Sequence, residues 1–327
     1  MTDASDAEAR SPDPPSDVPC SKKRKEAFAP DWMITFEDAS ALQNVTESLY
    51  AVMNRVTFRA KRIGDHFYLK AEGADPGQTC FVNARLKIDK VEFRSRAIER
   101  DYFEFRVDCK QFLYSIRDST CSQGTLTIQD RPIDAKIVIK IHDPDMPSHT
   151  SCSMLNTFVE PEQTDSLNPL NFKLIVEIGM KYLKEILKKA KDADAETMEL
   201  NVRVKPHGSK YRSITTFTVK GETQHVQEDC ADASKAEDGS MIVRANGDGE
   251  ANEEDDDDSM DEHDCDISIR HTYPIQKIHA FVKNMHQTIV VAKMEQGMPL
   301  MLEHGIAGSI NGESYVQFFV APVNDDD

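Results

Sequence analysis

The chain has 327 residues, 39% of them hydrophobic, which is enough to build two packed domains. It has no run of 18 apolar residues and its N-terminus is polar and acidic, so the pattern argues against a membrane span and a secretory signal. The seven cysteines are scattered without C-x-x-C or zinc spacing, which is typical of reduced thiols. We therefore expect a soluble, intracellular protein without a bound metal.

The net charge of −18 is concentrated in one region rather than spread over the chain. Seventeen Asp and Glu residues lie between Gln224 and Asp266, against Lys235 and Arg244, and three more acids end the chain. The remaining residues are nearly neutral. The overall acidity therefore does not exclude a basic surface that binds phosphates.

Residues 1–31 are rich in Ser, Pro, Asp and Ala and are predicted to be a disordered tail. A basic cluster interrupts the tail and is a candidate nuclear-import signal: Lys22, Lys23, Arg24 and Lys25. Solvated charge or a non-specific phosphate contact is the alternative. Nuclear localisation is the resulting prediction.

The first half reads as a helix at 39–53, several short strands and a second helix. The strands are expected at 57–60, 66–71, 79–88 and 102–107, and the second helix at 109–117. Further strand pairs follow the second helix.

The second half repeats this order. A helix at 180–191 precedes strands at 197–204 and 213–220, and a further helix is expected near 276–285. Residues 228–264 read as an acidic, disordered insertion, in which Ser259 has an acidic context suited to phosphorylation. Residues 324–327 form an acidic tail. The pattern predicts an α+β chain with an internal structural repeat.

The C-terminus carries motifs of a known family. Met298-Pro299-Leu300-Met301-Leu302-Glu303 is followed by a strand-like run from Ser314 to Val323 that contains Ala321-Pro322, and Tyr273-Pro274-Ile275-Gln276 precedes the last helix. In these motifs and in element order the chain resembles the proliferating cell nuclear antigen (PCNA) family of DNA sliding clamps. The tail and the insertion are additional to the family pattern.

The resemblance implies a ring-forming clamp fold of two similar domains, 32–157 and 172–323, each with two helices and antiparallel sheets. It makes 136–143 the interface strand of the first domain, 148–157 the strand after it, and 158–171, which contains Pro161 and Pro169, the linker between the domains. It implies a processivity factor, without catalysis or cofactor, that encircles duplex DNA independently of sequence and recruits replication and repair enzymes. Implied partners are clamp subunits in a trimer, a DNA polymerase, a clamp loader and clients with short peptide motifs.

A clamp that slides needs cations near phosphates rather than contacts to base edges. In the helix at 180–191, lysines recur on the face opposite Leu183, Ile186, Leu187 and Ala190, whereas the helix at 39–53 has no Lys or Arg. An ordinary solvated lysine face is the alternative. The candidate DNA-binding residues are Lys181, Lys184, Lys188, Lys189, Lys191, Lys110, Arg117, Lys277 and Lys283.

Two partner surfaces also follow from the resemblance. The client groove would be lined by Leu167, Leu170, Pro299, Phe318, Ala321 and Pro322, although Phe318 suits a core position equally well. Ring closure would pair an edge strand at 135–141 with one at 223–227 of the next subunit. The candidate interface residues are Ile137, Ile139, Ile141, Gln224 and Val226.

Other functions remain open at this point. A subunit of a heterotrimeric DNA-damage checkpoint clamp would explain the uncharged first helix and the insertion. An acidic nuclear interaction protein, such as a histone chaperone, would explain the acidic segments but not the repeat. The sequence has no Gly-rich phosphate loop, nucleophile elbow or HExxH motif, which argues against an enzyme.

Overall fold

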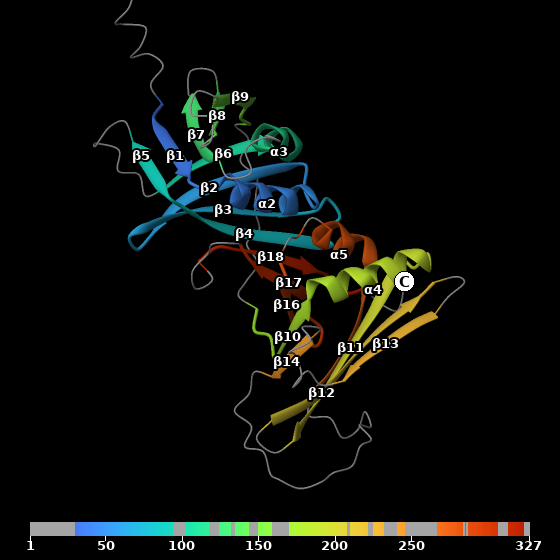
Figure 1. The fold of residues 1–327 in the computed structure, drawn as a ribbon. Helices are drawn as coiled ribbons and strands as arrows, with labels where there is room; N and C mark the ends of the chain where they lie inside the picture. The colour runs from blue at the N-terminus through green and yellow to red at the C-terminus, as the bar shows by residue number, and fades with distance from the viewer. Residues whose placement is uncertain are drawn as a thin grey trace, which may run out of the picture.

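The structure is a computed structural model of the 327-residue chain (Figure 1). It describes residues 30–93, 102–117, 124–131, 135–143, 150–158, 170–207, 210–221, 225–231, 241–245, 267–283, 285, 287–306 and 313–323. The predicted import cluster, the predicted tails, Leu167 and Gln224 lie outside these residues.

The first half contains nine strands and two helices among its described residues. Their order is β1 (Trp32–Phe36), α2 (Ala39–Tyr50), β2 (Arg55–Ile63), β3 (His66–Ala74), β4 (Cys80–Ile88), β5 (Lys90–Phe93), β6 (Tyr102–Asp108), α3 (Cys109–Ile116), β7 (Thr125–Arg131), β8 (Lys136–His142) and β9 (Thr150–Asn156). Each helix starts at an aspartate: the Asp38 carboxylate accepts from Ser40 N at 2.8 Å, and that of Asp108 from Gln111 N at 2.9 Å.

The second half repeats the order of elements. It contains β10 (Leu174–Gly179), α4 (Met180–Asp192), β11 (Thr197–His207), β12 (Lys210–Lys220), β13 (His225–Ala231), β14 (Met241–Ala245), β15 (Ile267–Pro274), α5 (Ile275–Val282), β16 (Ile289–Met294), β17 (Leu300–Gly305) and β18 (Tyr315–Val320). In Figure 1 the two halves lie end to end, and the helices follow one another in the order α3, α2, α5, α4.

Three antiparallel sheets contain all of these strands. A five-stranded sheet has the order β5-β1-β7-β8-β9, and a four-stranded sheet the order β13-β12-β11-β15. A nine-stranded sheet, β14-β10-β16-β17-β18-β4-β3-β2-β6, crosses from one half to the other because β18 pairs with β4. The halves are thus joined by a continuous sheet, and we retain the two-domain boundaries as a proposal.

Equivalent hydrogen bonds relate the two halves residue by residue. Ala39 N, at the start of α2, donates to Gly124 O at 3.1 Å, and Met180 N, at the start of α4, donates to Thr288 O at 2.8 Å. The second helices match as well: Cys109 N and Ile275 N donate to the residues before β2 and β11, Asn54 O and Glu196 O. These bonds and the strand registers make β1–β9 the counterparts of β10–β18.

Each half has its core between the helices and the sheets. In the first half, Trp32 stacks on Phe103 at 4.4 Å between ring centroids, and Phe58 contacts Phe105 and Phe112. In the second, Leu183, Ile186, Leu187 and Ala190 of α4 are buried. Burial of these apolar faces leaves the polar faces of the helices to form one side of the molecule.

Two expectations from the sequence need correction. The segment at 135–141 is not at a sheet edge, because β8 pairs with β7 on one side and β9 on the other; Ile137, Ile139 and Ile141 are core residues. The predicted insertion at 228–264 is also not entirely irregular. It includes the end of β13 and the whole of β14, whose short apolar run pairs with β10.

Candidate DNA-facing and partner-binding surfaces

Helix α4 presents the main row of cations. Its apolar residues pack inward, and four lysines are exposed on its other side: Lys181, Lys188, Lys189 and Lys191. Lys189 and Lys191 lie in the last turn, where the helix dipole favours positive charge. The helix therefore combines a stable inner face with a cationic outer one.

Lys184 differs from its neighbours on α4. It is half-buried, and its Nζ donates to the backbone O of Met285, just beyond α5, at 2.8 Å. This bond ties α4 to α5. The Lys184 ammonium is therefore already hydrogen-bonded within the protein. We assign it a structural role, the connection of α4 to the end of α5, in addition to any contact with phosphates.

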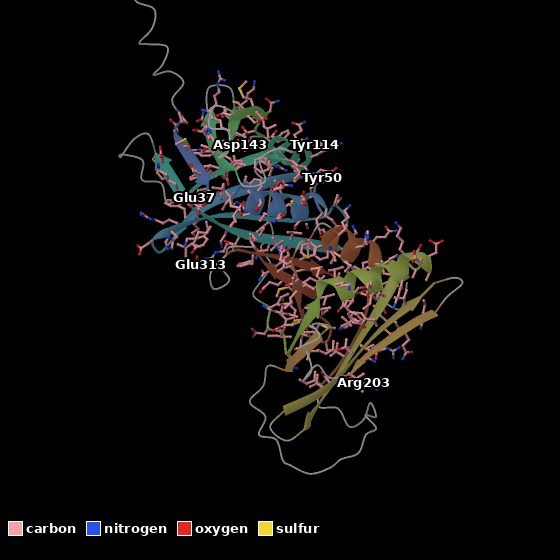
Figure 2. All side chains as sticks on the ribbon, in the orientation of Figure 1. Glu37, Tyr50, Tyr114, Asp143, Arg203 and Glu313 are labelled. Atoms are coloured by element: carbon pink, nitrogen blue, oxygen red, sulfur yellow. The ribbon has the colours of Figure 1, made fainter. Side chains whose placement is uncertain are left out.

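The helices of the first half carry less positive charge. Lys110 is exposed on α3, but Arg117 lies 3.8 Å from the buried Glu47 of α2, measured from Nη2 to Oε1. Tyr114 is the most exposed large hydrophobic residue of the described chain, at 67%, and Tyr50 is exposed at 40% (Figure 2). This surface is aromatic and polar rather than cationic.

The α5 candidates separate into one exposed and one paired residue. Lys283 follows the helix and is exposed. Lys277 Nζ lies 2.7 Å from Oδ2 of Asp75, which is 5% exposed in the turn between β3 and β4. Because Asp75 belongs to the first half and Lys277 to the second, this pair joins the halves.

The surroundings of Asp75 hold it ionised. Burial by itself raises the pKa of Asp75, but hydrogen bonds from Lys277, from Cys80 N and from Thr79 Oγ1 outweigh burial and lower that pKa to about 2. The same hydrogen bond raises the pKa of Lys277. Burial, and next the Asp75 charge, raise the pKa of the Cys80 thiol to about 12, so Cys80 is not a nucleophile.

The candidate client groove lies where the C-terminal segment meets both halves. Leu170, Pro299, Ala321 and Pro322 are half-buried. Ala321 N donates to Thr79 O at 2.9 Å, and Val323 N to Thr272 O at 2.8 Å. These bonds fix the segment between the β3–β4 turn and β15, and leave its proline and alanine partly open to a ligand.

Phe318 and Phe319 lie on opposite faces of β18. Phe318 is fully buried and stacks on Phe281 at 4.5 Å, which supports the core assignment for Phe318. Phe319 pairs opposite Phe81 of β4, and the two rings lie 6.0 Å apart. Phe319 lies on the face opposite Phe318, as strand alternation requires, and is 8% exposed.

Six strands lie at sheet edges among the described residues: β5, β9, β14, β6, β13 and β15. Of these, β9 ends the five-stranded sheet and β13 ends the four-stranded sheet. The predicted interface segment at 223–227 overlaps β13, in which Val226 pairs with Val219. On β9, Met154 is 55% exposed and Cys152 is an exposed free thiol.

The part of the chain that the structure describes holds neither a cluster of metal ligands nor a helix that could span a membrane. That part contains no group of three or more His, Cys, Asp or Glu side chains able to hold a metal ion. None of its helices is long and apolar enough to cross a membrane.

Comparison with solved structures reveals a relationship that sequence comparison does not. No family model matches the chain, and no curated protein matches it significantly. The crystal structure of proliferating cellular nuclear antigen from Entamoeba histolytica superposes with a TM-score of 0.66 at 13% identity, covering 90% of this chain and 100% of that one.

A second structure gives the same result. PCNA from Thermococcus kodakaraensis matches with a TM-score of 0.66 at 13% identity, covering 89% of this chain and 100% of the archaeal one. In both cases the match spans the helices and sheets of both halves. The chain therefore has the α+β clamp fold of PCNA.

Proposed function

We propose that the protein is a subunit of a DNA sliding clamp, which encircles duplex DNA, catalyses nothing and recruits replication and repair enzymes. The observation that carries this proposal is the incomplete second junction in its sheets. Within the chain, β18 of the second half pairs with β4 of the first. Their counterparts, β9 and β13, are both edge strands, with no further partner among the described residues.

Joining β9 of one subunit to β13 of the next would complete a second nine-stranded sheet, from five strands and four. Repetition of this contact produces a head-to-tail ring, and the resemblance implies three subunits. The helices would then line the ring, with the α4 lysines facing duplex DNA. Pairing also satisfies edge strands that would otherwise be open to aggregation.

The register of the internal junction predicts which residues meet between subunits. Gln317 of β18 pairs with Asn83 of β4, and their counterparts are Cys152 of β9 and Gln227 of β13. We expect Gln227→Cys, made in a Cys230→Ser background, to give covalent dimers and trimers with Cys152 on mild oxidation or with a short bis-maleimide. Non-reducing gel electrophoresis measures the products.

The matched control is the same variant carrying Cys152→Ser, which should remain monomeric on the gel. Absence of cross-linked species from both proteins, at a concentration where the native mass is that of a trimer, would contradict the β9–β13 contact. A persistent monomer by native mass would instead point to a ring with other subunits.

A heterotrimeric checkpoint clamp is the second candidate. It is favoured by α2, which has no lysine or arginine and whose Glu47 draws Arg117 toward itself. If each subunit carried this weakly charged α2–α3 surface, positive charge would be spread unevenly around the ring lining. Such an uneven lining is more easily explained in a ring whose subunits differ. Native mass of the purified protein separates the alternatives: a trimer alone supports the replication type, and assembly only with two different partners supports the checkpoint type.

The client groove gives a separate prediction. Ala321→Asp with Pro322→Asp places two charges on the half-buried C-terminal segment, where an apolar peptide anchor would bind. We expect a peptide with a glutamine and aromatic anchors to bind the variant at least about tenfold more weakly, since a buried unpaired charge costs more than 1.4 kcal/mol. Isothermal titration calorimetry measures the affinity.

The control is Glu303→Gln on β17, a polar position of the same sheet whose side chain pairs with Lys293 and Gln317. It should leave peptide affinity unchanged. Equal affinities for the wild type and the Asp variant would assign Ala321 and Pro322 to the structure of the C-terminal segment alone.

A further inference from the structure

The first half bears a cationic surface on the side of its sheet that faces away from the helices. Five cations on three adjacent strands of the nine-stranded sheet form this basic face: Arg59, Lys61, Lys70, Arg85 and Lys87. Arg59, Lys70 and Arg85 are cross-strand neighbours in one row, and Lys61, Tyr68 and Lys87 in the next. The opposite face of these strands is buried core.

The basic face is only partly neutralised. Glu104 lies 3.6 Å from Arg59, and Glu313 lies 2.9 Å from Lys87. Arg85 covers the Tyr68 ring at 3.9 Å. The described residues provide no carboxylate within ion-pair distance of Lys61 or Lys70. An excess of positive charge thus persists on a strongly acidic protein.

The internal repeat shows that the fold does not require this charge. The registers make Asn201, Arg203, Thr216, Asp229 and Ala231 the counterparts of the five cations in the second half. Only Arg203 among these is positive. The basic face is therefore a property of this sequence at this surface, and charge complementarity points to a polyanionic partner.

We infer that the basic face binds single-stranded nucleic acid. A flexible strand can lay successive phosphates over a flat array of cations, whereas a rigid duplex touches a flat sheet along a narrow line. The border of the face also offers base-stacking area: Tyr102, cross-strand partner of Lys61, is 43% exposed, and Ile63 is 38% exposed. The Tyr102 hydroxyl donates to Glu104, which holds the ring in place.

The basic face is separate from the surface that would line a ring. Glu313, at its edge, lies on the opposite side of the first half from Tyr50 and Tyr114 of the helices (Figure 2). The inference goes beyond the proposed clamp function and does not depend on it, because a single chain carries all five cations. In a clamp, the face would bind a single strand outside the ring.

The test is fluorescence anisotropy of labelled oligo(dT) with the full chain, titrated at several salt concentrations. We expect Lys61→Gln with Lys70→Gln to weaken binding by about tenfold. Loss of two phosphate contacts should also reduce the slope of log K against log salt by about 1.4. Both positions are on the surface, so circular dichroism should show an unchanged fold.

The matched control is Lys173→Gln with Lys220→Gln, which removes the same charge from two exposed positions of the second half that belong neither to the basic face nor to α4. It should leave oligo(dT) affinity within about twofold of wild type, a difference of less than 0.5 kcal/mol. An equal loss in both variants, or no loss in the first, would overturn the inference. Competition by poly-glutamate as strong as by unlabelled oligo(dT) would assign the face to acidic polypeptides and also overturn it.

A failure here can be told apart from a failure of the clamp proposal. The Lys61→Gln/Lys70→Gln variant should still cross-link through Cys152 and Gln227→Cys and still be retained on duplex DNA. Loss of oligo(dT) binding with retention of both ring properties is the result that the inference predicts.

Discussion

Replacing both Lys181 and Lys188 with glutamate should lower retention of the protein on duplex DNA by at least about tenfold, with the largest effect at low salt. Both lysines are exposed on α4, and each reversal exchanges a phosphate contact for repulsion. Lys184 is not used, because its Nζ binds Met285 O and its loss would also disturb the packing of α4 on α5.

The measurement begins with assembled protein threaded onto linear duplex DNA, whose ends are then blocked. A clamp stays bound until the DNA is cut, so the fraction retained after a wash reports on encirclement and on lining charge together. The control is Lys61→Glu with Lys70→Glu, an equal change of charge on the opposite surface. Equal retention of all three proteins would remove α4 from the DNA-facing surface.

The uneven lining has a structural origin. On α2, Glu47 is 5% exposed and is held by Gln43 Nε2 at 3.1 Å, and Arg117 approaches it from α3. The positive charge of Arg117 is therefore partly neutralised by Glu47 at the contact between α2 and α3. We expect α4 to supply most of the electrostatic attraction in each subunit, with Tyr50 and Tyr114 as uncharged contacts.

The elements most accurately predicted from sequence were those with a strong local period. The predicted helix at 180–191 is α4, Met180–Asp192, because its apolar residues recur at helical spacing along the whole segment. The clamp fold was also predicted correctly, because the C-terminal motifs and the order of elements resemble the PCNA family. Helix ends were less accurate: α5 ends at Val282, before the predicted 285.

Properties set by distant contacts were missed. The segment 135–141, with its alternating isoleucines, was matched to the family's interface strand. The edge strand next to it, β9, carries Ser151, Cys152 and Ser153 and has no apolar pattern. Edge position depends on which strand pairs next, and a short polar strand gives little local signal of that. The strand β14 was missed for a similar reason, because the acidic residues on both sides of its five residues make the whole segment resemble a disordered insertion.

The pairing of Lys277 with Asp75 is the clearest such case, since the residues are 202 positions apart. Sequence analysis assigned Lys277 to DNA, whereas the structure places it against a buried carboxylate of the other half. We expect Lys277→Met to destabilise the protein by about 1 to 3 kcal/mol, because Asp75 keeps its bonds to Thr79 and Cys80 N but loses its countercharge. Urea unfolding measures the change.

The pH dependence of stability tests the same pair. The pKa of Asp75 is depressed from its ordinary value of 3.8 to about 2, so its contribution is present above about pH 4 and is lost as the pH falls toward 2. We therefore expect the difference in unfolding free energy between wild type and Asp75→Asn to shrink over that interval. The same measurement on Glu303→Gln serves as the control. The change in its unfolding free energy with pH gives the general effect of acid on the other carboxylates, which is subtracted from the Asp75→Asn result.

A double-mutant cycle then separates the pair from its surroundings. If the ion pair joins the halves, Asp75→Asn with Lys277→Met should cost less than the sum of the single changes, because neither residue leaves a buried charge unpaired. Additive costs, with no change in the wild-type difference between pH 4 and pH 2, would mean that Lys277 is solvated and available to DNA after all. The stability of the junction would then come from the β18–β4 pairing and from the packing of Phe319 on Phe81.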